Sequence, residues 1–222
     1  MRHIAQREDI RDLILDGVDI LLARFGFRKM TMEDLARQVG IGKGTIYLHF
    51  STKEELTLAH IDRIAQRLLV RLEKIAQSQA PPGEKLREML ITRVLFRFDS
   101  VAHYSLSLND LLSSIRKNLL ARREVHFQNE ARVLRKVLQD GIRQGLLRSR
   151  NATVAARVLI WSTNSLLPFN LAAAELGRRR EIEHRIGQIA DQLLQGLRPI
   201  ERTPPERVHQ ASGIKCRNRG GK

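Results

Sequence analysis

Two glycines separated by one apolar residue, Gly40-Ile41-Gly42, interrupt a helical pattern and restrict what the surrounding stretch can form. The segment before them opens at Thr31, an N-cap residue with Asp34 three positions later, and the segment after them covers residues 43–50. The glycines permit a tight turn with the side chain of Ile41 tucked inward. Helix, glycine turn and helix together predict a helix-turn-helix, whose second helix reads the DNA major groove.

A helical wheel divides residues 43–50 into a buried and an exposed face. At about 100° per residue, Ile46 and Phe50 fall together and face a small core. On the opposite side, Thr45 and His49 can hydrogen-bond to base edges, while Leu48 offers a methyl surface suited to thymine. Gly44 lies on this side as well and allows close approach.

Groups beside this face are placed for the DNA phosphates. These are Lys43, Lys53 and the Tyr47 hydroxyl, together with the backbone amides at the helix starts after Thr31 and Thr52. The expected DNA contacts are therefore Thr31, Lys43, Gly44, Thr45, Tyr47, Leu48, His49, Thr52 and Lys53. The alternative is a purely structural three-helix unit with a polar outer face.

The same stretch resembles the DNA-binding region of the TetR family of bacterial transcriptional regulators, over about the first quarter of the chain. The matching pieces are Phe25-Gly26-Phe27, Thr31, Leu35-Ala36, Gly40, Lys43-Gly44, Tyr47, His49-Phe50, Lys53 and Leu56. The chain departs from the family at Gly42, where a capping serine is common, and at Leu48, which is often polar or aromatic. The first difference removes a cap, and the second leaves the operator sequence open.

Composition is that of a globular protein with 28% charged and 42% hydrophobic residues. The 222-residue length allows one large or two small domains. No apolar run approaches the roughly 20 residues of a membrane span, and no signal-peptide pattern is present. The single cysteine, Cys216, lies in a polar tail and cannot form an intrachain disulfide. We therefore expect a cytoplasmic protein that does not bind membranes.

The net charge of +15 is unevenly distributed. Residues 1–60 carry nine Lys and Arg against nine Asp and Glu, and the acids lie mostly between Glu8 and Asp19, away from the predicted DNA face. The excess of basic residues lies in the remainder of the chain. Basicity therefore adds non-specific DNA affinity, whereas the motif carries the prediction of specific binding.

Helical periodicity continues to the end of the folded region. The capping-box pattern after Thr52 opens a long helix that extends to a break at residues 78–83. We expect further helices over 84–98, 110–115, 117–145 and 151–173, the last kinked at Pro168, and a final helix over 182–197. The predicted class is all-α, with a helix-turn-helix domain over 1–52, a larger helical domain over 53–198, and a basic, disordered tail over 199–222.

The last two helices carry apolar stripes that no later element of the same chain could cover. We therefore expect a homodimer interface between these helices and their symmetry mates. The predicted interface residues are Val158, Ser162, Ser165, Phe169, Ile182, Ile186, Ile189 and Leu193.

Catalytic patterns are absent from the sequence. The seven histidines are scattered without metal-ligand spacing, and there is no nucleophile motif, phosphate loop or paired carboxylate. We expect neither an enzyme nor a metal or cofactor site. Aromatic and neutral polar residues of the second region are candidates for a ligand pocket: Phe96, His103, Tyr104, Phe127, Trp161 and Asn164.

These features favour a ligand-responsive transcriptional regulator. The family resemblance implies an all-helical homodimer of roughly nine helices, with an N-terminal DNA-binding domain and a C-terminal domain for dimerisation and ligand binding. It also implies repression at a palindromic operator and release by a small molecule. Two alternatives remain: a basic protein that coats DNA with weak specificity, and a helical adaptor whose helix-turn-helix binds protein.

Overall fold

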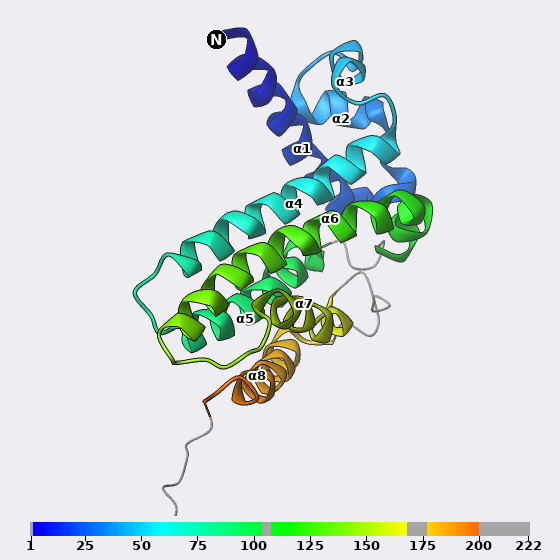
Figure 1. Ribbon diagram of the computed structural model, residues 1–222. Helices are drawn as coiled ribbons and strands as arrows, with labels where there is room; N and C mark the ends of the chain where they lie inside the picture. The colour runs from blue at the N-terminus through cyan, green and yellow to red at the C-terminus, as the bar shows by residue number, and fades with distance from the viewer. Residues whose placement is uncertain (1, 104–107, 168–176, 200–222) are drawn as a thin grey trace, which may run out of the picture.

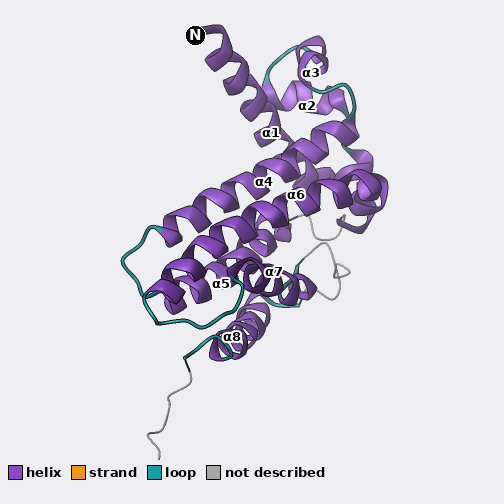
Figure 2. Cartoon of the chain, viewed as in Figure 1, coloured by secondary structure: helices purple, strands orange, loops and turns teal. Residues whose placement is uncertain are grey.

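A computed structural model of the chain describes residues 2–103, 108–167 and 177–199, and these ranges are helical with no strand (Figures 1 and 2). The all-α prediction is confirmed. The helices are α1 (Arg2–Lys29), α2 (Met32–Val39), α3 (Lys43–His49), α4 (Lys53–Ala76), α5 (Pro82–Val101), α6 (Leu108–Arg143), α7 (Ala152–Ser162) and α8 (Arg179–Gln195), with a short 3-10 turn, η2 (Asn164–Leu166). The described helices include no candidate membrane span.

The first three helices form a small head at one end of the molecule (Figure 1). Gly26 interrupts α1 with a φ of 71°, a left-handed value that favours glycine, and one further helical turn follows it. Gly17 lies where α1 crosses α2, because a Cβ atom built on it would approach Val39 to 2.5 Å and Leu35 to 2.8 Å. The head is therefore held together by close helix contact as well as by apolar side chains.

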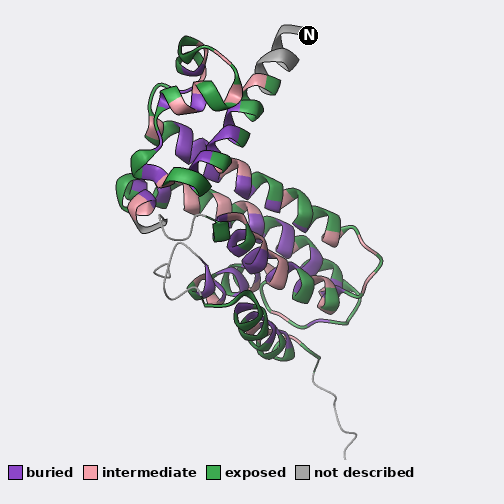
Figure 3. Ribbon diagram, turned by 180° about the vertical axis from the view of Figure 1, so that it is seen from behind, coloured by how far each residue is buried: buried purple, intermediate pink, exposed green. Residues whose placement is uncertain are grey.

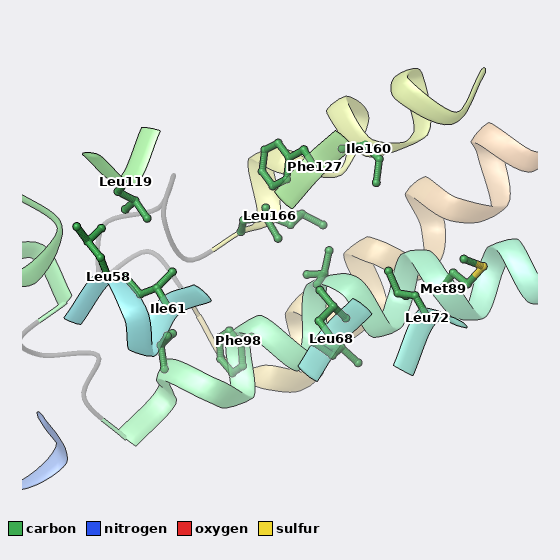
Figure 4. Packing of buried hydrophobic residues seen from close by; sticks show 14 of the residues in the cluster. Leu58, Ile61, Leu68, Leu72, Met89, Phe98, Leu119, Phe127, Ile160 and Leu166 are labelled. Atoms are coloured by element: carbon green, nitrogen blue, oxygen red, sulfur yellow. The ribbon is translucent and has the colours of Figure 1, made fainter. Parts of the chain in front are cut away.

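The long helices α4 and α6 run side by side away from the head, with α5 packed against both (Figure 1). Their facing sides share one hydrophobic core, part of which is seen in Figure 4, where Leu68 of α4, Met89 of α5 and Phe127 of α6 point inward. The helix α6 is continuous over residues 108–143, which corrects the expected break near residue 116. No glycine or proline lies near that position to interrupt it.

The helix α7 begins as the sequence predicts and ends earlier. The Asn151 side chain accepts hydrogen bonds from the amides of Thr153 and Val154, at 2.9 and 3.1 Å, as an N-cap. Helical structure ends at Ser162, and Leu167 is extended, as the residue before a proline usually is. One helix reaching residue 173 is therefore excluded, and the expected kink at Pro168 lies outside the described residues.

The helix α8 packs along α5, an earlier element that covers part of the apolar stripe expected to face a second subunit. Ile182 and Ile186 are completely buried in the single chain, whereas Ile189 and Leu193 are partly exposed. The outer side of α8 is mainly polar and exposed (Figure 3). Of the four apolar residues of α8 expected at a dimer interface, only Ile189 and Leu193 are thus accessible to another subunit.

Candidate nucleic-acid interface and effector cavity

The turn between α2 and α3 follows from its local sequence. The hydroxyl oxygen of Thr31 accepts a hydrogen bond from the Asp34 amide at 3.1 Å and opens α2. Gly40 ends α2 with a φ of 75°, and its amide donates to the carbonyl of Ala36 at 3.0 Å. Gly42 is the N-cap of α3 and supplies no side-chain cap, so α3 begins without this stabilisation.

The two faces of α3 are divided as the helical wheel predicts. Ile46 and Phe50 are 0% and 1% exposed, and they fasten α3 to the head. Leu48 is 77% exposed and Tyr47 is 47% exposed. Thr45 and His49 are half-buried beside Leu48, and no side chain covers Gly44, because a Cβ atom there would meet nothing within 4 Å. The outer face of α3 is therefore open, with Tyr47 and Leu48 exposed beside the uncovered Gly44.

Lys53 occupies a different place from the one expected of a phosphate contact. Its ammonium group donates to the carbonyl oxygens of Phe27, Arg28 and Met30 at 3.0, 3.4 and 3.3 Å, and stands 4.5 Å from the centre of the Phe27 ring. Lys53 therefore caps the end of α1 and ties it to the start of α4. By contrast, Lys43 is exposed, with its Nζ atom 3.9 Å from Glu33 Oε2, too far for a firm hydrogen bond.

Carboxylates fix both helix starts near this face. Asp34 accepts a hydrogen bond from the Thr31 hydroxyl at 2.6 Å, and Glu55 accepts from the hydroxyl and amide of Ser51 at 2.5 and 2.9 Å. These hydrogen bonds lower the pKa of both carboxyl groups. The Thr52 hydroxyl oxygen accepts from the Glu55 amide at 3.0 Å. In α2 and α4 the amide of the third residue therefore already donates to the capping threonine. Only the amides of the first two residues of each helix remain available to a phosphate.

Comparison with known proteins agrees with this geometry. The sequence profile described as "Bacterial regulatory proteins, tetR family" matches residues 14–59, which span the helix-turn-helix. A TetR-family transcriptional regulator from Pectobacterium atrosepticum has the same fold, with a TM-score of 0.71 and 20% identity over 89% of this chain and 98% of that one. Residues 14–59 therefore match the DNA-binding region of the TetR family, and the chain has the fold of a TetR-family regulator.

Two relatives share parts of the sequence. An uncharacterized HTH-type transcriptional regulator from Haemophilus influenzae is 32% identical over 83 residues, which are 37% of this chain and 44% of that protein. The HTH-type transcriptional repressor KstR2 from Mycobacterium tuberculosis is 24% identical over 145 residues, which are 65% of this chain and 70% of that protein. The helix-turn-helix region is thus similar to that of DNA-binding transcriptional regulators.

Two acidic residues of α1, Asp16 and Asp19, pair with side chains of the body. Asp16 Oδ1 lies 2.8 Å from Arg63 Nη1 of α4. Asp19 Oδ1 lies 3.1 Å from His103 Nε2, just after α5, and 3.4 Å from His60 Nε2 of α4. Burial raises the pKa of Asp19, but the two histidines outweigh burial and bring the pKa below its ordinary value. These pairs join the head to the body.

The candidate pocket residues are not all brought together. Phe127 of α6 and Trp161 of α7 line one cavity of about 300 Å³, which we call the α6–α7 cavity. His103 instead pairs with Asp19, and the Asn164 side chain accepts from Arg93 Nη2 at 2.5 Å. Phe96 is half-buried beneath the guanidinium of Arg71, 4.5 Å from its ring centre. Tyr104 lies outside the described residues.

Behind Phe127 lies a buried charge cluster that the sequence analysis missed. Glu130 Oε2 accepts from Arg93 Nε at 2.6 Å, Glu130 Oε1 accepts from Arg97 Nη2, and Arg93 Nη1 donates to Thr163 Oγ1 at 2.7 Å. Burial lowers the pKa of Arg93 to about 10, against the opposing effect of Glu130, so the guanidinium stays charged at neutral pH. The sequence signal is the pair Arg93 and Arg97, four positions apart within the mainly apolar stretch 89–98 of α5.

The expected interface residues also fall into groups. Val158 is 41% exposed and, with Val154 and Trp161, forms an exposed apolar stripe along α7. Ser165 is exposed as well, while the Ser162 hydroxyl donates to the Val158 carbonyl at 2.8 Å. Phe169 lies outside the described residues. Since Ile182 and Ile186 are buried within the chain, the accessible candidates are the α7 stripe and the partly exposed Ile189 and Leu193.

Proposed function

We propose that this regulator is a cytoplasmic, ligand-responsive repressor that binds a palindromic operator as a homodimer and is released by a small molecule. The observation that carries the DNA-binding part is the outer face of α3, where Leu48 is 77% exposed beside an uncovered Gly44. Thr45, Leu48 and His49 contact base edges, and Lys43 and the Tyr47 hydroxyl contact phosphates.

Support for regulation comes from the joints between head and body. Two long helices reach the head: α4 through Arg63 and Asp16, and α6 through Asp110, whose Oδ1 atom lies 2.9 Å from Arg28 Nη2 of α1. A displacement of either helix by an ångström or two would rotate the head and change the spacing between the two reading helices of a dimer. A ligand that binds the displaced state ~100-fold better shifts the balance by about 2.7 kcal/mol.

Selection of binding sites from random DNA tests the readout. The wild-type chain should return a palindrome whose half-sites reflect the two-fold axis of the dimer. Leu48→Arg should change the preferred base and weaken binding to the original site by about 1–3 kcal/mol. If the variant selects the same operator, Leu48 does not contact base edges in the groove.

Salt titration separates the alternatives. A repressor discriminates between its selected site and random DNA at every salt concentration, whereas a coating protein binds both alike and loses both as salt rises. Absence of DNA binding even at low salt would favour the adaptor function and reject the proposal.

A further inference from the structure

The α6–α7 cavity combines an apolar wall with a cationic rim. Phe127 and Ala131 of α6 and Ile160 and Trp161 of α7 provide the wall. Three arginines line the same cavity: Arg132 and Arg135 of α6 and Arg157 of α7. Its volume of about 300 Å³ is at the lower end of the range for small-molecule sites.

The three arginines are not neutralised within the described part of the chain. Arg132 Nη1 donates to the neutral amide oxygen of Asn129 at 3.1 Å, and Arg157 lies 5.9 Å from the centre of the Trp161 ring. The Nε atom of Arg135 is buried and has no hydrogen-bond partner there. Glu124 is the acidic residue of the lining, and it accepts a hydrogen bond from Gln128 at 3.0 Å.

The arginines Arg87 and Arg97, which line two other cavities, do have carboxylate partners within the protein. Arg87, beside the open groove between the start of α5 and the end of α8, has its Nε atom 2.6 Å from Asp191 Oδ1. Arg97, beside the small cavity between α4 and α6, is paired with the buried Glu130. Among these three cavities, the α6–α7 cavity is therefore the one whose arginines have no carboxylate partner in the described part of the chain, which leaves them available to an external anion.

We propose that the α6–α7 cavity binds an amphipathic organic acid. The acid group pairs with Arg135 and Arg157, since charge-assisted hydrogen bonds to guanidinium satisfy the buried Arg135 donor. The aromatic or aliphatic body lies against Phe127 and Trp161. Such an acid would be the effector of the proposed repressor, and this link to DNA rests on the proposed function. Binding of the acid itself does not, because it is measured on the protein alone.

The test compares two fluorescent probes that differ by one charge. Anilinonaphthalene sulfonate carries an aryl body and a sulfonate, and phenylnaphthylamine carries the same body without the anion. Titration of the full chain should show tighter binding of the sulfonate. Arg135→Gln and Arg157→Gln should each weaken sulfonate binding about tenfold and leave the neutral probe nearly unchanged. Trp161, the single tryptophan of the chain, reports binding through its own emission.

Lys136→Gln is the matched control, because it removes one positive charge from the exposed side of α6 next to Arg135. Sulfonate binding should stay within about twofold of the wild type. Equal loss in the control, or an equal response of the two probes to the arginine variants, would overturn the site. Thermal unfolding of each variant confirms that the fold is intact. Sedimentation with and without the probe shows whether the probe dissociates the dimer; dissociation would mean that the probe competes with the second subunit for the α7 stripe, and would also overturn the site.

A separate titration uses DNA selected by the wild-type chain. If the acid is the effector, saturating sulfonate weakens DNA binding, and DNA weakens sulfonate binding by the same factor. Sulfonate binding at Arg135 and Arg157 without this coupling would uphold the anion site and reject the repressor mechanism. If sulfonate weakens DNA binding but the arginine variants still bind sulfonate normally, the anion site is rejected and the repressor mechanism is retained.

Discussion

At the scale of single residues, Gly17 and Gly44 occupy opposite environments. A methyl group at Gly17 would collide with the stiff, branched side chain of Val39, whereas one at Gly44 would meet nothing. Gly17→Ala should therefore destabilise the protein by about 1–3 kcal/mol. Gly44→Ala should leave the fold unchanged or stabilise it by up to about 0.5–1 kcal/mol, yet weaken operator binding, because its methyl group stands between α3 and the bases. Chemical denaturation and operator titration check both, and unimpaired DNA binding by Gly44→Ala would place the contact elsewhere.

Lys43 and Lys53 are two lysines of the head with different surroundings. Lys43→Gln should weaken binding to all DNA sequences alike and lower the salt slope by about one, because one phosphate contact is lost. Lys53→Gln should cost about 1 kcal/mol of stability, because three carbonyls at the end of α1 lose the positively charged ammonium group. Its salt slope should stay at the wild-type value. A lowered salt slope for Lys53→Gln would show that Lys53 contacts a DNA phosphate.

At the scale of elements, α5 and α6 are joined by Glu130 and its two arginines. The carboxylate is 2% exposed, and although burial raises its pKa, the charges of Arg97 and Arg93 outweigh burial and lower the pKa overall. Glu130→Gln leaves two buried guanidinium groups without a counter-charge and should cost about 3–5 kcal/mol. Asp191→Asn breaks the exposed pair with Arg87 and should barely move the unfolding midpoint. Similar midpoints for both variants would show that burial of the cluster is incomplete.

The stripe along α7 makes a separate prediction about subunit association. Val158→Arg puts a charge on an already exposed position, so the subunit should fold while its dimer dissociates at least about tenfold more readily. Val70→Arg on α4 is the control, since Val70 is 56% exposed and lies away from α7. Sedimentation measures both, and palindromic DNA binding should fall with the loss of the dimer. A Val158→Arg variant that remains dimeric would move the interface away from this stripe.

At the scale of the whole molecule, the joints between long helices depend on ionised carboxylates. Asp62 of α4 accepts from Arg122 and lies 2.9 Å from His126 Nε2, both on α6. Burial raises its pKa, but these partners lower it overall below the ordinary 3.8, as happens for Asp19. A carboxyl group with a lowered pKa stabilises the fold above its unfolded-state pKa, and this contribution disappears as the pH falls through the folded-state pKa.

The stability difference between the wild type and Asp62→Asn should therefore be constant near neutral pH and narrow as the pH falls below about 3.8. Denaturant midpoints measured between about pH 7 and about pH 3 check this. A difference that is independent of pH would mean that Asp62 contributes through packing and not through its charge.

Features that depend on neighbours along the chain could be predicted from the sequence. Caps at Thr31, Thr52 and Asn151, the turn at Gly40 and the outward face of α3 are fixed by hydrogen bonds and spacings within about four residues, so a local pattern contains their cause. The family resemblance rests on this same local stretch, and the profile match covers it. The all-α class follows as well, since helical periodicity is visible in every segment.

Contacts between side chains that are distant in the sequence became visible only in the folded structure. Lys53 donates to a carbonyl 26 positions away, Arg93 reaches Glu130 37 positions away, and Ile182 is covered by α5. The arginines of the α6–α7 cavity likewise meet Trp161 only because α6 and α7 pack together. The physical reason is that helical periodicity identifies which face of a helix is apolar, whereas its partner depends on how all the helices pack around one core.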